Sequence, residues 1–188
     1  MGGGRLPAAA VRLRCEQTRR RRFNSRSGRL VAYCAHIVGY AASGANFLRS
    51  IARLAREREE LRIVADQVGA PTSAALIADA VAKIVAEGGG HLRKNFADAN
   101  GLVHFAATGE TSWFGFASAI VAGLRSRGVP LAVQRILPIR TDEYPTPATR
   151  PKNSRLDLGR LARVFGITPP PWDAALAVEL DRLAQELA

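Results

Sequence analysis

The 188-residue chain has few of the residues that build disulfide frameworks, metal sites or membrane spans. Its two cysteines, Cys15 and Cys34, are too few for a disulfide framework and have no metal-ligand spacing. The three histidines are scattered, so no zinc or iron site is expected. No apolar run reaches the roughly 18 to 20 residues of a membrane-spanning helix. These absences favour a reducing, cytoplasmic setting without a metal site or a membrane partner.

Aromatic residues are also scarce, at 6% of the chain, although 47% of the residues are hydrophobic. A chain of this length suits one domain, and its core must be filled mainly by Ala, Leu, Val and Ile. The net charge of +11 is concentrated at the start. Residues 1–29 hold nine arginines and one acidic residue, whereas residues 30–188 hold 18 basic and 15 acidic residues. The nearly balanced second part gives no reason to expect a nucleic-acid partner.

The arginine-rich start has three readings. It is compatible with contact to phosphate or to a membrane surface, and with a targeting segment. It also lacks helical or strand periodicity, and its Arg, Gly, Ala, Pro and Ser content is what a GC-rich gene yields when read out of frame. We expect residues 1–38 to be a basic segment that is disordered or read out of frame, and residues 39–188 to form the domain.

From residue 30 onward the apolar residues follow strand and helix periods in turn. Strands are predicted at Leu30–Gly39, Leu61–Val64, Leu102–Ala106 and Leu131–Leu137. Helices are predicted at Asn46–Glu59, from Thr72 or Ser73 to Gly88, from Thr111 or Ser112 to about Arg127, at Leu158–Phe165 and at Trp172–Leu187. The inner face of the second helix is predicted to carry Leu76, Ile77, Ala80, Val81, Ile84 and Val85. His91–Asn100 is predicted to be an exposed polar loop. Because strands and helices alternate, the fold class is α/β.

The segment Tyr144–Asp157 is rich in proline and presents two arginines. Proline fixes φ and lacks an N–H donor, so this segment cannot be helix interior or central strand. In an extended chain, Arg150 and Arg155 can converge on one ligand together with Asn153 and Ser154. The guanidinium fork suits a carboxylate or a diphosphate. The alternative is a proline-rich surface connector.

Two further loops join a predicted strand to a helix start, at Asp66–Thr72 and at Thr108–Trp113. In α/β domains, ligands bind beyond the carboxyl ends of strands, at such loops. Gln67, Thr72 and Thr111 offer neutral hydrogen bonds there. The alternative for each residue is ordinary helix capping or, for Trp113, packing in the core.

Taken together and in this order, the three loops resemble those of the dTDP-4-dehydrorhamnose reductases, which are extended short-chain dehydrogenases. The matching pieces are Asn46–Leu48, Ala65–Ser73, Gly101–Phe105, Gly109–Phe114, Tyr144–Asp157 and the closing Phe165–Ile167 with Pro171–Trp172. The resemblance implies reduction of the 4-keto group of a dTDP-sugar with NADPH or NADH, and it allows magnesium. Residues 39–188 would then be the sugar-nucleotide-binding C-terminal part of a Rossmann-type enzyme, in the synthesis of dTDP-L-rhamnose.

The residues that this family needs for catalysis are missing from the sequence. Gly2-Gly3-Gly4 neither follows a strand nor precedes a helix, so it is no phosphate-binding turn. The three tyrosines, Tyr33, Tyr40 and Tyr144, have no lysine four residues later. We therefore expect no catalytic and no cofactor-binding residue here, and an N-terminal Rossmann half that is missing.

Two classes of function follow from this reading. In the first, the chain is reductase-like but inactive alone. In the second, it is a non-catalytic nucleotide-sugar-binding module or regulatory subunit. Its expected substrate-binding residues are Arg150, Arg155, Asn153, Ser154, Gln67, Thr72 and Thr111. Its expected partners are a dTDP-sugar and a separate Rossmann-domain polypeptide or further copies of itself.

Overall fold

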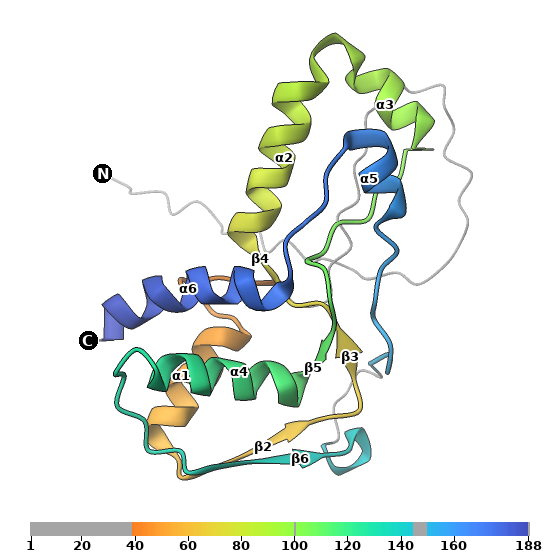
Figure 1. Ribbon diagram of the computed structural model, residues 1–188. Helices are drawn as coiled ribbons and strands as arrows, with labels where there is room; N and C mark the ends of the chain where they lie inside the picture. The colour runs from red at the N-terminus through yellow and green to blue at the C-terminus, as the bar shows by residue number, and fades with distance from the viewer. Residues whose placement is uncertain (1–38, 100, 145–149, 188) are drawn as a thin grey trace, which may run out of the picture.

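The computed structural model describes residues 39–99, 101–144 and 150–187 (Figure 1). The basic segment 1–38 and nearly all of the strand predicted at Leu30–Gly39 lie outside the described residues. The helices are α1 (Phe47–Glu57), α2 (Ala74–Gly88), α3 (Leu92–Asp98), α4 (Trp113–Arg125), α5 (Gly159–Phe165) and α6 (Trp172–Leu187), with 3-10 turns η2 (Gly89–His91) and η3 (Thr141–Glu143). The strands are β1 (Gly39–Tyr40), β2 (Glu60–Val64), β3 (Val68–Gly69), β4 (Thr72–Ser73), β5 (Thr111–Ser112) and β6 (Arg135–Ile139).

The strands pair as three two-stranded ladders among the described residues. The longest joins β2 to β6 in parallel, with Glu60 opposite Arg135 and Val64 opposite Ile139. β1 pairs with β4 in parallel, and β3 pairs with β5 antiparallel. Because helices connect the strands in sequence, the predicted α/β class is confirmed.

The starts of α1, α2 and α4 are fixed by side-chain caps. Asn46 Oδ1 accepts from Arg49 N at 3.3 Å at the start of α1. Of the two candidates for α2, Ser73 is the cap, because its Oγ accepts from Leu76 N at 3.1 Å. Ser112 caps α4 in the same way, with Gly115 N at 3.0 Å. These caps satisfy N–H groups that a helix cannot satisfy internally.

The described residues form two hydrophobic cores. In Figure 1, α1, α4 and α6 lie in one group, and α2, α3 and α5 lie in another. In the larger core, α1 and α4 pack against each other and on β2, α6 packs on α4, and an aromatic cluster lies within it. The ring of Phe116 is fully buried, and its centroid lies 5.1 Å from Tyr40, 5.5 Å from Phe47 and 6.0 Å from Trp172. The smaller core lies among α2, α3 and α5, where Phe96 and Phe165 are 5.0 Å apart.

The predicted polar loop at His91–Asn100 is wrong, because most of it forms α3. Leu92 and Phe96 lie one helical turn apart, and Phe96 is buried against Phe165. Two apolar side chains among polar ones were enough to anchor a short helix. The burial predicted for Val81 and Val85 is also wrong, since these residues are 47% and 58% exposed. The side of α2 that packs on the smaller core is narrower and carries Leu76, Ile77, Ala80 and Ile84.

The strand predicted at Leu102–Ala106 does not form a ladder among the described residues. Its buried side chains, Val103 and Phe105, pack on the smaller core instead. The carbonyl of Leu102 accepts from the Arg160 side chain at 2.8 Å. The strand predicted at Leu131–Leu137 is displaced to Arg135–Ile139, since its register is set by β2. No described helix is long and apolar enough to cross a membrane.

The aromatic cluster predicts where the fold is most sensitive to mutation. Phe116→Ala should lower the free energy of unfolding by about 3–5 kcal/mol, because it removes a fully buried ring and leaves a cavity. Urea unfolding followed by circular dichroism measures the change. Val178→Ala, at a 50% exposed position of α6, is the control and should stay within about 0.5 kcal/mol of wild type. Similar stabilities for both variants would contradict this role of the cluster.

Candidate functional site

The strand β3 brings three distant loops together at one place. On one edge it pairs with β5, with Gly69 opposite Thr111. On the other edge, Val68 N donates to Lys152 O and Ser154 N donates to Val68 O, each at 2.8 Å. The described part of the proline-rich segment therefore runs beside β3 as an extra strand-like piece. The three loops singled out in the sequence are neighbours in the structure.

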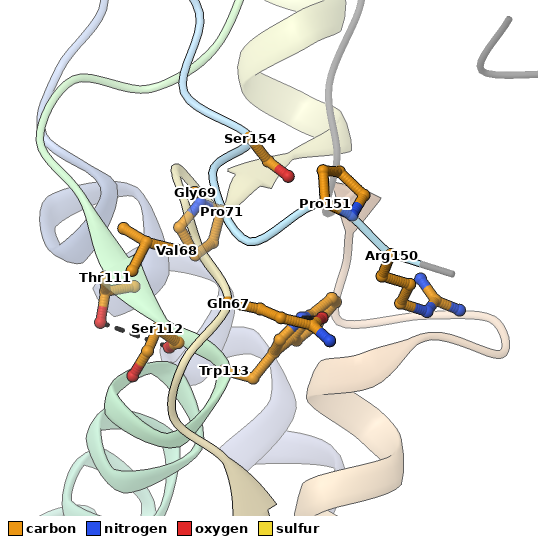
Figure 2. A pocket seen from close by; sticks show the side chains of 10 residues that line it. All are labelled: Gln67, Val68, Gly69, Pro71, Thr111, Ser112, Trp113, Arg150, Pro151 and Ser154. Carbon is orange, nitrogen blue, oxygen red and sulfur yellow. Dashed lines mark hydrogen bonds between the residues drawn. The ribbon is translucent and has the colours of Figure 1, made fainter. Parts of the chain in front are cut away.

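A pocket of about 420 Å³, open to solvent, lies at this junction (Figure 2). It is lined by Gln67, Val68, Gly69, Pro71, Thr111, Ser112, Trp113, Arg150, Pro151 and Ser154. Four of the seven expected substrate-binding residues are thus brought together, namely Gln67, Thr111, Arg150 and Ser154.

Side chains beside the pocket form a polar chain that ends at a carboxylate. Gln67 accepts from the indole Nε1 of Trp113 and donates to Thr141 Oγ1, both at 3.1 Å. The Thr141 hydroxyl donates to Asp66 Oδ1 at 2.6 Å, and this hydrogen bond lowers the pKa of the Asp66 carboxyl. This series of hydrogen bonds therefore links the ends of β2 and β6 to the start of α4.

Arg155 and Asn153 lie outside the pocket lining, where they brace the proline-rich segment. Asn153 Oδ1 accepts from the backbone N–H of Arg155 at 3.1 Å and from its Nε at 3.0 Å. The Arg155 guanidinium also forms an ion pair with Glu110, which precedes β5. Both residues are exposed, so this pairing contributes orientation more than stability. The structure separates the two arginines, because Arg150 lines the pocket whereas Arg155 connects two of its loops.

Thr72 lies away from the pocket, in the interior. Its side chain is fully buried, and its hydroxyl donates to Ala70 O at 3.0 Å and accepts from Ala107 N at 3.1 Å. These contacts join β4 to the extended segment that precedes Thr108.

The comparisons with known proteins agree with this arrangement. Residues 30–185 match the family described as the RmlD substrate binding domain. The chain belongs to this family. A dTDP-4-dehydrorhamnose reductase of Burkholderia thailandensis is 50% identical over 143 residues, which are 74% of this chain and 47% of that protein. The chain thus spans about half the length of the curated relatives that it matches.

Solved structures show the same fold. The crystal structure of a dTDP-4-dehydrorhamnose reductase from Clostridium acetobutylicum superposes with a TM-score of 0.68 at 32% identity, covering 81% of this chain and 48% of that one. The enzyme of the same name from Bacillus anthracis, in complex with NADP, gives a TM-score of 0.67 at 28% identity, covering 82% and 49%. The resemblance found in the sequence is therefore confirmed.

The described residues do not fit a nicotinamide cofactor. Their glycine run, Gly88 to Gly90, lies at the C-terminal end of α2, where carbonyl groups rather than N–H groups are free. In Rossmann-type domains, the diphosphate of the cofactor is bound by backbone N–H groups at a helix N-terminus. Tyr40 is only 2% exposed, and burial raises its pKa, whereas a proton donor near neutral pH needs a lowered one. Within the described ranges, no three His, Cys, Asp or Glu side chains cluster as a metal site would require.

The pocket also contains residues that sequence reasoning did not assign to it. The sequence alone predicts only packing in the core for Trp113 and only a helix cap for Ser112. Val68, Gly69, Pro71 and Pro151 also line the pocket. The one sequence signal for these residues is that they belong to the three loops. Their meeting in one pocket could not be predicted locally, because β3 pairs with the segment around Asn153, 85 positions away.

The position of Thr72 yields a prediction that separates a structural role from a ligand role. Thr72→Val keeps the shape but leaves Ala107 N–H without its acceptor, so we expect a loss of about 1–3 kcal/mol in unfolding free energy. The affinity of the folded variant for dTDP should stay unchanged. Thermal melts and dTDP titration measure the two effects. A variant with native stability and weakened dTDP binding would restore Thr72 as a ligand contact.

Proposed function

We propose that this chain binds a dTDP-linked sugar at the pocket between β3, β5 and the proline-rich segment. The observation that carries the proposal is the convergence of the three family loops on a single pocket that has Arg150 in its lining. An arginine fork suits a diphosphate, and Thr111 and Ser154 offer neutral hydrogen bonds beside it. The relatives' names point to the same ligand, since both solved relatives and the Burkholderia protein are dTDP-4-dehydrorhamnose reductases.

In a whole reductase, this site would hold the 4-keto sugar nucleotide while a cofactor supplies hydride. We propose that the chain alone supplies binding and orientation but no chemistry. Neither Tyr40 nor Tyr144 has a lysine four residues later in the sequence. The glycine run Gly88 to Gly90 lies at the C-terminal end of α2, where the free carbonyl groups disfavour a phosphate. Reduction would then need a Rossmann domain from a separate polypeptide. As an alternative partner, we propose further copies of this chain.

The second candidate function is a non-catalytic nucleotide-sugar-binding or regulatory subunit. The same absence of a Tyr-x-x-x-Lys sequence favours it, because binding would then be the whole function. The family resemblance allows magnesium, and its binding stays a proposal. Within the described ranges, no cluster of three His, Cys, Asp or Glu side chains supports it.

The activity of the purified full chain tests the catalytic part of the proposal. With dTDP-4-dehydrorhamnose and NADPH, we expect no consumption of NADPH above background, because substrate binding cannot replace the hydride source or the proton donor. Absorbance of NADPH and analysis of the sugar product measure the reaction. Stoichiometric turnover by homogeneous protein would contradict the proposal.

The affinity for dTDP tests the binding part of the proposal. Arg150→Ala should weaken dTDP binding by roughly ten- to a hundredfold, since a charge-assisted hydrogen bond contributes about 1.5–3 kcal/mol. Arg155→Ala is the matched control, because Arg155 is paired with Glu110 and lies outside the pocket lining, and it should weaken binding less. Isothermal titration of dTDP into the folded proteins measures both. Equal affinity in wild type and Arg150→Ala would show that this arginine does not hold the ligand.

A further inference from the structure

The amide of Gln67 is buried and occupied at both ends. The residue is 8% exposed, its Oε1 accepts from Trp113, and its Nε2 donates to Thr141. A buried polar group with its bonds made inside the protein holds its neighbours in place. This arrangement differs from the sequence-based expectation, in which Gln67 donates a hydrogen bond to the ligand.

The hydrogen-bond chain has one direction only. The indole N–H of Trp113 can only donate, so the oxygen of the Gln67 amide must face it and the nitrogen must face Thr141. The Thr141 hydroxyl then donates to the Asp66 carboxylate, which also accepts from Thr141 N at 3.0 Å. Because each donor has one acceptor and the chain ends at an anion, its bonds reinforce one another. Gln67 has no alternative orientation that keeps these bonds.

Trp113 is held on a second side by packing. Its ring centroid lies 4.6 Å from that of Phe47, at an angle of 53°. Phe47 begins α1, whereas Gln67 follows β2, so two separate elements fix the indole. The indole also lines the pocket, where Figure 2 shows it beside the Gln67 side chain. A fixed aromatic surface in a pocket suits stacking of a flat ring, and base–aromatic stacking is tolerant of base identity.

We infer that Gln67 is a positioning residue, which orients the Trp113 indole as the wall on which the base of a nucleotide stacks. Gln67 acts through the indole and does not itself touch the ligand. This inference rests on the proposed function, because it assumes that the pocket takes the dTDP part of the substrate. It divides the pocket into a stacking surface at Trp113 and a charged part at Arg150.

A double-mutant cycle tests the inference with dTDP as the probe and the full chain as the protein. Gln67→Met removes both polar ends at similar length, and Trp113→Phe keeps a ring but removes the N–H. We expect Gln67→Met to weaken dTDP binding about tenfold in the wild-type background, the range of a stacking contact. In the Trp113→Phe background it should change binding less than about twofold. A tenfold loss in both backgrounds, or no loss in either, would overturn the inference.

Fluorescence provides a readout that does not need a ligand. The sequence has two tryptophans, so Trp172→Phe leaves Trp113 as the only emitter. In this background, Gln67→Met should shift the emission of Trp113 and speed its anisotropy decay, whereas Thr111→Val should leave both unchanged. Thr111 is the matched control because it lines the pocket outside the polar chain. An unchanged Trp113 signal in Gln67→Met would overturn the inference.

Two further outcomes are separable. If Gln67→Met does not fold, Thr141→Val replaces it, because it removes the acceptor of the Gln67 Nε2 donor and should shift the Trp113 emission in the same direction. An unchanged Trp113 emission in a folded Thr141→Val variant would count against the inference. If wild type binds no dTDP at all, the proposed function fails, while the fluorescence arm still decides whether Gln67 holds the indole.

Discussion

The pocket depends on the backbone hydrogen bonds of a two-residue strand. β3 uses one edge for β5 and the other for the residues around Asn153, so three segments far apart in sequence meet along Val68 and Gly69. Backbone pairing fixes spacing and register together, which side-chain contacts between exposed loops could not do. At Gly69, an added Cβ would lie 3.4 Å from the Cβ of Ser154, which is a van der Waals contact, so the two segments lie directly side by side. Loops that are individually ordinary become a site because one short strand lies between them.

Around that backbone framework, the polar side chains have distinct tasks. Neutral groups form a series of hydrogen bonds from Trp113 through Gln67 and Thr141 to the Asp66 carboxylate, which gives the pocket a fixed wall. The charged groups lie outward, where Arg155 pairs with Glu110 and Lys152 lies 3.9 Å from Asp66. Surface pairs of this kind contribute little stability but can orient loops. The arrangement keeps a guanidinium at the pocket without burying an uncompensated charge, which would cost far more.

The parts of the fold that follow from local sequence were predictable, and the parts that depend on distant partners were not. Helices with a wide apolar stripe and a capping residue, such as α1 and α4, lie within a few residues of their predicted bounds. α3 was missed because its burial comes from a ring on α5, which no local pattern reveals. The same holds for the site: its loops could be named from the sequence, but the difference between Arg150 and Arg155 depends on Glu110, 45 residues before Arg155. The position of Thr72 in the interior could not be predicted either, because its hydroxyl accepts from Ala107 N, 35 residues away in the sequence.

The proposed separation of binding from chemistry has a physical basis in how the site is supported. Every contact that shapes the pocket wall comes from described residues of this chain: Phe47 packs on the indole, Ser112 caps the helix that carries it, and β3 holds the loops. These contacts are local to the substrate domain, so a binding surface of this kind can form without the elements that hold a cofactor. Catalysis is different, because proton and hydride transfer need reacting groups placed from both sides of the substrate. A site can therefore keep its recognition of a nucleotide sugar while its chemistry depends entirely on what is placed opposite it.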